Sequence, residues 1–441
     1  MQKEKVSLIV HSSAIVTMDA ERSLIYDGAV AVKNNRIVAI GKTEDILLGY
    51  SADDTIDGSD KALMPGLIDL HAHSTLTRGI CDDDELLRYL QVVYPKTAAL
   101  TPEDAYIGAL TTHCDSIKSG TTCINDMYRH MLSNADAVEK SGIRANLSCI
   151  LGDDSFGIET VEANKTLVRE RHESANGRIR TCFGIEGTLM VSAENLAEIR
   201  DFCQQYDIGL HTHIGETEEC REGSRKRHGK VCLEVLNDYG LLGPKTILAH
   251  CVKLNDEETS LIVNSGAHIS HNPHPNAKCG MGVAPIPKLR DLGVNIGLGH
   301  DTSTASNSQD LFEVMRFAVL IQRAYTGNPC ILTAMDALEM ATINGARALG
   351  LGDEIGSIEV GKKADMILID LDTPHMTPRL TGKFDNLMSN LVYSAQGSDV
   401  NTSIIDGRIV MRNREILTFD EKEALFRANI AGNNLMARID A

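Results

Sequence analysis

Short apolar segments alternate with longer helical patterns between about residue 62 and about residue 300 of this chain. The longer stretches, such as residues 102–119 and 193–206, carry apolar side chains at intervals typical of amphipathic helices. Repeated strand–helix units over this length match a barrel of parallel strands surrounded by helices. We therefore predict an α/β protein built on a (β/α)8 TIM barrel. Its predicted strands are residues 62–70, 121–126, 144–150, 180–185, 209–213, 246–250, 268–271 and 295–299.

Both flanks of the predicted barrel have a different pattern, with short alternating strands and turn signals. Asn34-Asn35 and Asp406-Gly407 are good hairpin turns between such strands. We predict that both termini contribute to one small β-sandwich, packed against the barrel. The predicted boundaries are 1–61 for the N-terminal part of the sandwich, 62–358 for the barrel, and 359–441 for the C-terminal part with a closing helix near residues 420–438.

The composition of the chain argues against several classes of function. The 441 residues carry a formal net charge of −18, which argues against a nucleic-acid surface. No apolar run reaches the length of a membrane span, and the first residues do not resemble a signal peptide. The 11 cysteines include no closely spaced pair, so we expect reduced thiols in a cytoplasmic protein that contacts no membrane.

The segment Leu67-Ile-Asp-Leu-His71-Ala-His73 indicates metal chemistry. Residues i and i+2 of a strand face the same side, so both imidazoles would project together from the strand end. Two such rings suit one divalent metal ion. The alternative is that the pair simply forms a polar strand face.

Similar groups end three further predicted strands. One reads His211-Thr-His213-Ile-Gly-Glu216, which places a carboxylate close to a possible ligand. Such a carboxylate can take a proton from metal-activated water and return it to a leaving group. His250 could coordinate metal or polarise the substrate, and Asp301 could bind metal or accept a proton. Each group alone could be structural, but four strand ends in barrel order favour one catalytic site.

With these motifs the chain resembles the amidohydrolase superfamily. The closest resemblance is to the branch of the methylthioadenosine/S-adenosylhomocysteine deaminases and the triazine hydrolases, and it extends over nearly the whole chain. The matching segments are residues 64–73, 119–122, 211–217, 248–251, 297–307, 340–347 and 356–365.

The resemblance implies that His71, His73, His213 and Asp301 bind one divalent metal. It also implies that Glu216 is the catalytic proton shuttle, and that His250 orients the water or the reacting centre. His211 would then lie beside the metal ligands without binding the metal itself. Binuclear relatives have a lysine at the end of strand four, where this chain has Glu186, so we expect a mononuclear site. Zinc is the expected metal, with iron as the alternative.

The implied reaction is hydrolytic deamination of a nitrogen heterocycle, in which metal-activated water displaces ammonia. Aminated purines, pterins, pyrimidines and triazines are the candidate small-molecule substrates. A triazine chlorohydrolase or a cyclic amidase on the same scaffold is the alternative, although the presence of both Glu216 and Asp301 favours an amine leaving group. A metal-binding barrel without turnover and a metal-free structural barrel are further alternatives. Members of this group are often oligomers, so we expect a homo-oligomer.

Three further residues are predicted to contact the substrate, namely Glu186, His274 and Asn276. Glu186 could instead be a capping carboxylate, and the loop of His274 and Asn276 could be only a proline-rich turn. Nucleoside-type members usually have an acidic residue beside a tryptophan after strand one, where this chain has residues 86–90 and no Trp. They usually have His-Ala-Pro-Tyr-Thr after strand four, where this chain has Glu186-Gly-Thr-Leu-Met190. Both departures argue against an adenosine-type substrate.

Overall fold

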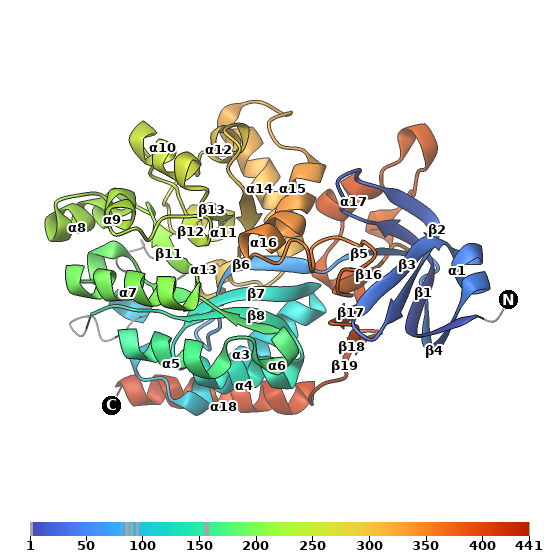
Figure 1. Cartoon of the computed structure of the whole chain (residues 1–441), viewed down its shortest axis with the longest axis horizontal. Coiled ribbons are helices and arrows are strands. Elements are labelled where there is room, and N and C mark those ends of the chain that lie inside the picture. The colour runs from blue at the N-terminus through green and yellow to red at the C-terminus, as the bar shows by residue number, and fades with distance from the viewer. Residues whose placement is uncertain are drawn as a thin grey trace.

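The computed structural model describes residues 3–80, 82–83, 88, 91–93, 97–153 and 158–440. Two five-stranded sheets of parallel strands form its larger part, and helices surround them (Figure 1). The first sheet has the order β15 (Asp301–Thr302), β6 (Leu67–His73), β7 (Thr121–Tyr128), β8 (Arg144–Cys149) and β9 (Ile179–Thr181). The second has the order β10 (Phe183–Ile185), β11 (Leu210–Ile214), β12 (Thr246–His250), β13 (His268–His271) and β14 (Ile296–Leu298). The α/β architecture predicted from the alternating pattern is therefore confirmed.

Helices follow the parallel strands along the chain. Many begin at a side-chain cap, as α3 does, where Thr101 and Asp104 form a capping box. The α-helices among the described residues of this part are α3 (Pro102–Lys118), α4 (Met131–Ser141), α5 (Val161–Arg171), α6 (Ser174–Gly177), α7 (Ala193–Tyr206), α8 (Glu218–His228), α9 (Cys232–Asp238), α10 (Asp256–Ser265), α11 (Pro273–Lys278), α12 (Ile286–Asp291), α13 (Ser303–Ser306), α14 (Leu311–Thr326), α15 (Ala334–Ala341) and α16 (Ile343–Ala348).

A nine-stranded sheet joins the two ends of the chain. Figure 1 shows it at the right, where N-terminal strands in blue lie beside C-terminal strands in orange and red. Its order is β19 (Glu415–Ile416), β18 (Arg408–Arg412), β17 (Val400–Ile405), β16 (Met366–Asp370), β5 (Lys61–Pro65), β1 (Glu4–Val16), β2 (Leu24–Lys33) and β3 (Arg36–Lys42), with β4 (Tyr50–Asp57) pairing β1. The termini thus share one sheet, with its own cluster of buried apolar side chains. Helices α1 (Thr43–Gly49) and α17 (Leu387–Tyr393) belong to the same terminal segments.

The last helix, α18 (Glu421–Asp440), confirms the predicted closing helix. It lies along the lower edge of the molecule in Figure 1, beside α3, and Lys118 of α3 forms an ion pair with Glu421 over 2.7 Å. Both predicted hairpin turns are also present, Asn34-Asn35 between β2 and β3 and Asp406-Gly407 between β17 and β18. Among the described residues, no helix is both long and apolar enough to cross a membrane.

The prediction of one continuous strand over residues 62–70 is wrong. The chain changes sheets at Gly66, which separates β5 in the nine-stranded sheet from β6 in the parallel sheet. A Cβ atom at Gly66 would lie 2.0 Å from Oγ1 of Thr122, so only glycine fits this crossing. Periodicity could not reveal the change, because the residues on both sides of it are buried.

A buried ion pair connects the parallel strands to the nine-stranded sheet. Arg144 of β8 is 1% exposed and donates from Nε and Nη2 to both carboxylate oxygens of Asp365, over 2.8 and 3.0 Å. Asp365 directly precedes β16. Nη2 also lies 3.3 Å from Oδ1 of Asp406, in the turn between β17 and β18. A bidentate pair of this kind holds two planar groups in one orientation, so it sets how the two parts meet.

Candidate active site

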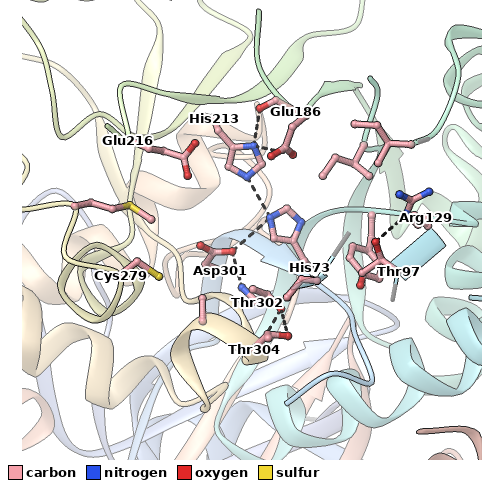
Figure 2. Close-up of a pocket in the computed structure, with 16 residues that line it drawn as sticks. His73, Thr97, Arg129, Glu186, His213, Glu216, Cys279, Asp301, Thr302 and Thr304 are labelled. Carbon is pink, nitrogen blue, oxygen red and sulfur yellow. Dashed lines mark hydrogen bonds and ion pairs between the residues drawn. The ribbon is translucent and has the colours of Figure 1, made fainter. Parts of the chain in front are cut away.

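Four parallel strands bring their predicted site residues to one place. His71 and His73 end β6, His213 lies near the end of β11, and His250 ends β12. The ring of His71 is 4.7 Å from that of His73, 4.8 Å from that of His213 and 5.4 Å from that of His250, measured between centroids. Asp301 begins β15 and points toward this group (Figure 2). All are buried, so local strand geometry and parallel pairing together assemble the cluster.

The donor atoms of these side chains converge as metal ligands do. One group comprises His71, His73 and His213 and a second comprises His71, His250 and Asp301, with the ligand atoms of each group within 4.8 Å of one another. Nε2 of His73 lies 3.2 Å from Nε2 of His213 and 3.4 Å from Oδ1 of Asp301. Nε2 of His71 has no hydrogen-bond partner among the described residues. A divalent cation would satisfy these facing nitrogens, so the residues fit a metal site.

Hydrogen bonds at the opposite side of the rings favour the same conclusion. Nδ1 of His73 donates to the carbonyl of Met127, and Nδ1 of His213 donates to the carbonyl of Glu186 over 2.8 Å. A neutral ring with its proton on Nδ1 presents a lone pair at Nε2, which is the form that binds a cation.

Burial also sets the charges of the site. It lowers the pKa of His71 and His73 well below the ordinary value, and neighbouring imidazoles add to the effect. It lowers the pKa of His250 to about 3. These rings are therefore neutral near pH 7. Burial opposes the charged form of His213 too, but nearby carboxylates, that of Glu186 first, leave its pKa raised.

Two carboxyl groups face the cluster with raised pKa values. Burial raises the pKa of Glu216 to about 7, and the charges of Glu186 and Asp301 add to this shift against the opposing effect of His213. Burial likewise raises the pKa of Asp301 to about 6. A carboxyl group that titrates near neutral pH can both give and take a proton during a reaction.

A pocket opens over the cluster. Figure 2 shows Glu216 and Asp301 on one side of it, and Thr97 and Arg129 on the other. Nε of Arg129 donates to Oγ1 of Thr97 over 3.2 Å. Apolar side chains complete the walls, namely Val93, Ile150, Ile158, Met281 and Ala305. An apolar pocket with a few convergent polar groups is typical of a small-molecule site.

The predicted substrate contacts occupy different positions. Glu186 lines the pocket, and its Oε2 lies 3.3 Å from Nδ1 of His213. Asn276 is buried one step behind the pocket, where its Oδ1 accepts from Nδ1 of His250 over 2.8 Å. His274 is half-buried, with its ring 4.9 Å from that of Phe317. Neither Asn276 nor His274 is among the described residues that line the pocket.

Sequence reasoning missed Asp69, a residue that helps to build the site. Oδ1 of Asp69 accepts from the backbone N–H groups of His71 and His300, each over 3.2 Å, and its Oδ2 pairs with the ring of His300. Asp69 therefore ties the end of β6 to the residue before Asp301. Its position two residues before His71 on a buried strand was an available signal, because a buried carboxylate needs partners.

The backbone at the site adopts a rare conformation. His250, Cys251 and Asp301 have φ values of 72°, 51° and 69°, in the left-handed region that side-chain-bearing residues seldom occupy. Such conformations persist only where the surrounding structure enforces them, and they concentrate at functional sites.

The fold and the site together define a class of protein. Four histidines and a carboxylate converge at the ends of parallel strands, beside a carboxyl group that can exchange a proton near pH 7. This arrangement is that of a metal-dependent hydrolase. Residues 62–410 match the amidohydrolase family, and the chain belongs to that family. The resemblance inferred from the motifs is therefore confirmed.

Two relatives are similar to this chain over nearly its whole length. A 5′-deoxyadenosine deaminase from Methanosarcina mazei is 39% identical over 441 residues, covering 98% of this chain and 99% of the relative. A 5-methylthioadenosine/S-adenosylhomocysteine deaminase from Syntrophomonas wolfei is 37% identical over 436 residues, covering 98% of this chain and 100% of the relative.

Solved structures have the same fold. An adenosine deaminase from Xanthomonas campestris with bound zinc has a TM-score of 0.93 and 29% identity, covering 99% of this chain and 100% of that one. An atrazine chlorohydrolase from Arthrobacter aurescens complexed with zinc has a TM-score of 0.88 and 23% identity, covering 96% and 100%. The second likeness concerns the fold alone.

Proposed function

We propose that this protein is a metal-dependent hydrolytic deaminase that acts on an adenosine-type nucleoside, with 5′-deoxyadenosine as the first substrate to test. Hydrolytic deamination of a heterocycle agrees with its family and its deaminase relatives. The observation that carries the reaction type is the half-buried carboxyl group of Glu216, whose Oε1 lies 3.8 Å from Nε2 of His250 beside the ligand cluster and whose pKa is raised to about 7.

An adenosine-type substrate contradicts the expectation from the sequence, which argued against such a substrate. That interpretation relied on residues 86–90, of which only Arg88 lies within the described residues, and on Glu186-Gly-Thr-Leu-Met190. Relatives that are 37–39% identical over nearly the whole chain carry adenosine-type names, and we give this greater weight. Glu186 lines the pocket and supplies a carboxylate of the kind that accepts hydrogen bonds from sugar hydroxyls or amines. We keep it as a substrate contact.

The residues have separate roles in this proposal. His71, His73, His213 and Asp301 would hold one divalent ion, which we take to be zinc because a zinc-bound relative shares the fold. When bound, the ion makes water acidic enough to act as a nucleophile near pH 7. Asp301 accepts a proton from the attacking water.

Glu216 and His250 complete the chemistry. Glu216 donates its proton to the ring nitrogen as the amino-bearing carbon becomes tetrahedral. The proton that Asp301 accepted from the water passes to the amino group, which leaves as ammonia, and Glu216 regains a proton from the new hydroxyl group as the carbonyl forms. His250 is held at Nδ1 by Asn276, so Nε2 remains free to orient the attacking water. Asn276 would then position His250, while a substrate contact by His274 stays a prediction.

We also propose that the two parallel sheets are halves of one closed (β/α)8 barrel. Only Cys182 separates β9 from β10, and only Gly299 and His300 separate β14 from β15, which pairs with β6. The barrel segment would extend to residue 358, with its start moved from residue 62 to Gly66, and the terminal segments would form the small β domain. A homo-oligomer and a cytoplasmic location stay predictions; the ten described cysteines, all free thiols, agree with the latter.

An ammonia-release screen of purified, zinc-loaded protein tests the function. The panel contains 5′-deoxyadenosine, adenosine, methylthioadenosine and S-adenosylhomocysteine, beside guanine, a pterin, cytosine and an aminotriazine. We expect turnover of the adenosine derivatives and none of the free bases. Turnover of a free base alone would refute the nucleoside assignment. Chloride release from a chlorotriazine without any ammonia release would refute deamination.

A further inference from the structure

A chain of buried hydrogen bonds runs from His71 into the space between the parallel strands. Nδ1 of His71 lies 2.9 Å from Nε2 of His211, and Nδ1 of His211 lies 3.2 Å from Nδ2 of Asn125. Nδ2 of Asn146 donates to Oδ1 of Asn125 over 2.8 Å and lies 3.1 Å from Sγ of Cys182. All five side chains are buried. Asn146 and Cys182 also line a second pocket, so water can reach that end of the chain of hydrogen bonds.

Asn125 sets the direction of these bonds. Its Nδ2 also donates to the carbonyl of Leu70 over 2.8 Å, at an irregularity in the register of β6 and β7. A carbonyl can only accept, and Oδ1 of Asn125 already accepts from Asn146, so both ends of the amide are assigned. Nδ1 of His211 consequently accepts from Asn125. A neutral His211 then carries its proton on Nε2.

This direction places a proton where a ligand lone pair is needed. His211 donates from Nε2 to Nδ1 of His71, so a neutral His71 holds its own proton on Nε2. That nitrogen lies 3.7 Å from Oδ1 of Asp301 and has no hydrogen-bond partner among the described residues. A nitrogen that carries a proton cannot also bind a cation.

We propose that cation binding reverses the direction of this chain, and that His211 and Asn125 are positioning residues for the ligand His71. In the loaded protein, His71 donates from Nδ1 to His211, and His211 donates from Nδ1 to Asn125. The proton on Nε2 of His211 passes to Nδ1 of His71, the proton on Nε2 of His71 leaves to water as the cation binds, and Nδ1 of His211 takes one proton from water. The two rings hold two protons in either direction, so neither ring changes its charge. The inference rests on the proposed cation site but is independent of the substrate.

Every member of the chain can make this change. Neutral imidazole has two tautomers, and a primary amide can turn over to exchange its donor and acceptor. After the reversal, Asn125 donates to Oδ1 of Asn146, which can also accept from the thiol of Cys182. Burial raises the pKa of that thiol to about 11, so it keeps its hydrogen.

The reversal has one cost, which falls on Leu70. When the amide of Asn125 turns over, the carbonyl of Leu70 loses its donor, and this loss opposes cation binding. An aspartate at position 125 can only accept while it is ionised. It would favour the loaded direction before any cation arrives, and so strengthen binding.

Histidine tautomers can be measured directly in the full-length protein. Two-bond nitrogen–proton spectra of ¹⁵N-histidine-labelled protein, recorded with EDTA and then with zinc, distinguish Nδ1–H from Nε2–H. We expect His211 to change from Nε2–H to Nδ1–H on zinc addition, with a His211→Gln variant to assign its signals. His113 is an internal control, because it is buried against Ser141 and touches no ligand. One unchanged His211 tautomer in both states would overturn the proposal.

Zinc affinity gives an independent test through two variants. Asn125→Asp and Asn125→Leu both remove the donor to Leu70, and they differ in the acceptor at position 125 and in the negative charge that aspartate adds. By competition with a chelator, we expect Asn125→Asp to bind zinc more tightly than Asn125→Leu by roughly 10-fold, the lower end for an outer partner of a metal ligand. Equal affinities or the opposite order would contradict the reversal. If the wild-type protein binds no zinc, the proposed cation site fails, and this inference fails with it.

Discussion

Replacing Glu216 by glutamine tests the assignment of the proton-transferring group. The glutamate side chain is 14% exposed, and its Oε1 lies 3.8 Å from Nε2 of His250. Glu216 belongs to neither group of converging ligand atoms, so an amide of the same shape leaves the cation site intact. The amide can accept a hydrogen bond but cannot transfer a proton.

The expected loss follows from this role. General acid–base catalysis contributes roughly 100- to 10,000-fold to a rate, which is about 3 to 5 kcal/mol of barrier. The raised pKa of Glu216, about 7, keeps its proton available at neutral pH. We therefore expect kcat for 5′-deoxyadenosine to fall by roughly two to four orders of magnitude in Glu216→Gln.

The assay combines three measurements on the same preparations. Ammonia release gives kcat, mass spectrometry gives zinc content, and a pH series reports the titration. The protonated form of Glu216 is the donor and is lost as the pH rises through its pKa. The wild-type kcat should therefore decline on the alkaline side, and the variant should lack that decline. Near-wild-type activity of Glu216→Gln, or a loss of its zinc, would refute the reasoning.

Three further predictions concern the ligands, the core and the connection between sheets. His73→Ala should lose bound zinc, whereas His274→Ala, outside the pocket walls, should retain it; equal zinc contents would contradict the ligand assignment. Burial lowers the pKa of His113 to about 3. The unfolded chain therefore binds a proton there that the folded chain does not, and stability should fall by up to roughly 1.4 kcal/mol per pH unit below about 6.5. Urea unfolding of His113→Phe should lack this part of the slope. Arg144→Met should lower the free energy of unfolding by about 3 to 5 kcal/mol, because Asp365 is left as a buried, unpaired charge. An additional Asp365→Leu change should restore part of the loss in thermal unfolding.

Some features follow from residues that are neighbours in the chain. The same-side projection of His71 and His73 is a property of any strand, and the helices begin where caps such as Thr101 occur. The order of strand ends along a barrel then predicts that His213, His250 and Asp301 will meet them. Local periodicity was therefore enough to predict both the α/β class and the location of the proposed cation site.

Other features depend on contacts that no local pattern contains. The partners His71 and His211 are 140 positions apart, and Arg144 and Asp365 are 221 apart. The apolar run around Gly66 has the same periodicity whether it remains in one sheet or changes to another.

Asn276 and His274 show that a local pattern cannot predict contacts even for residues in a single turn. They are two residues apart, yet only Asn276 reaches His250. The sequence by itself determined which side chains end the strands, because strand and helix periods are local. Only the tertiary structure decided which of them touch, because burial and hydrogen bonding select partners by distance in space.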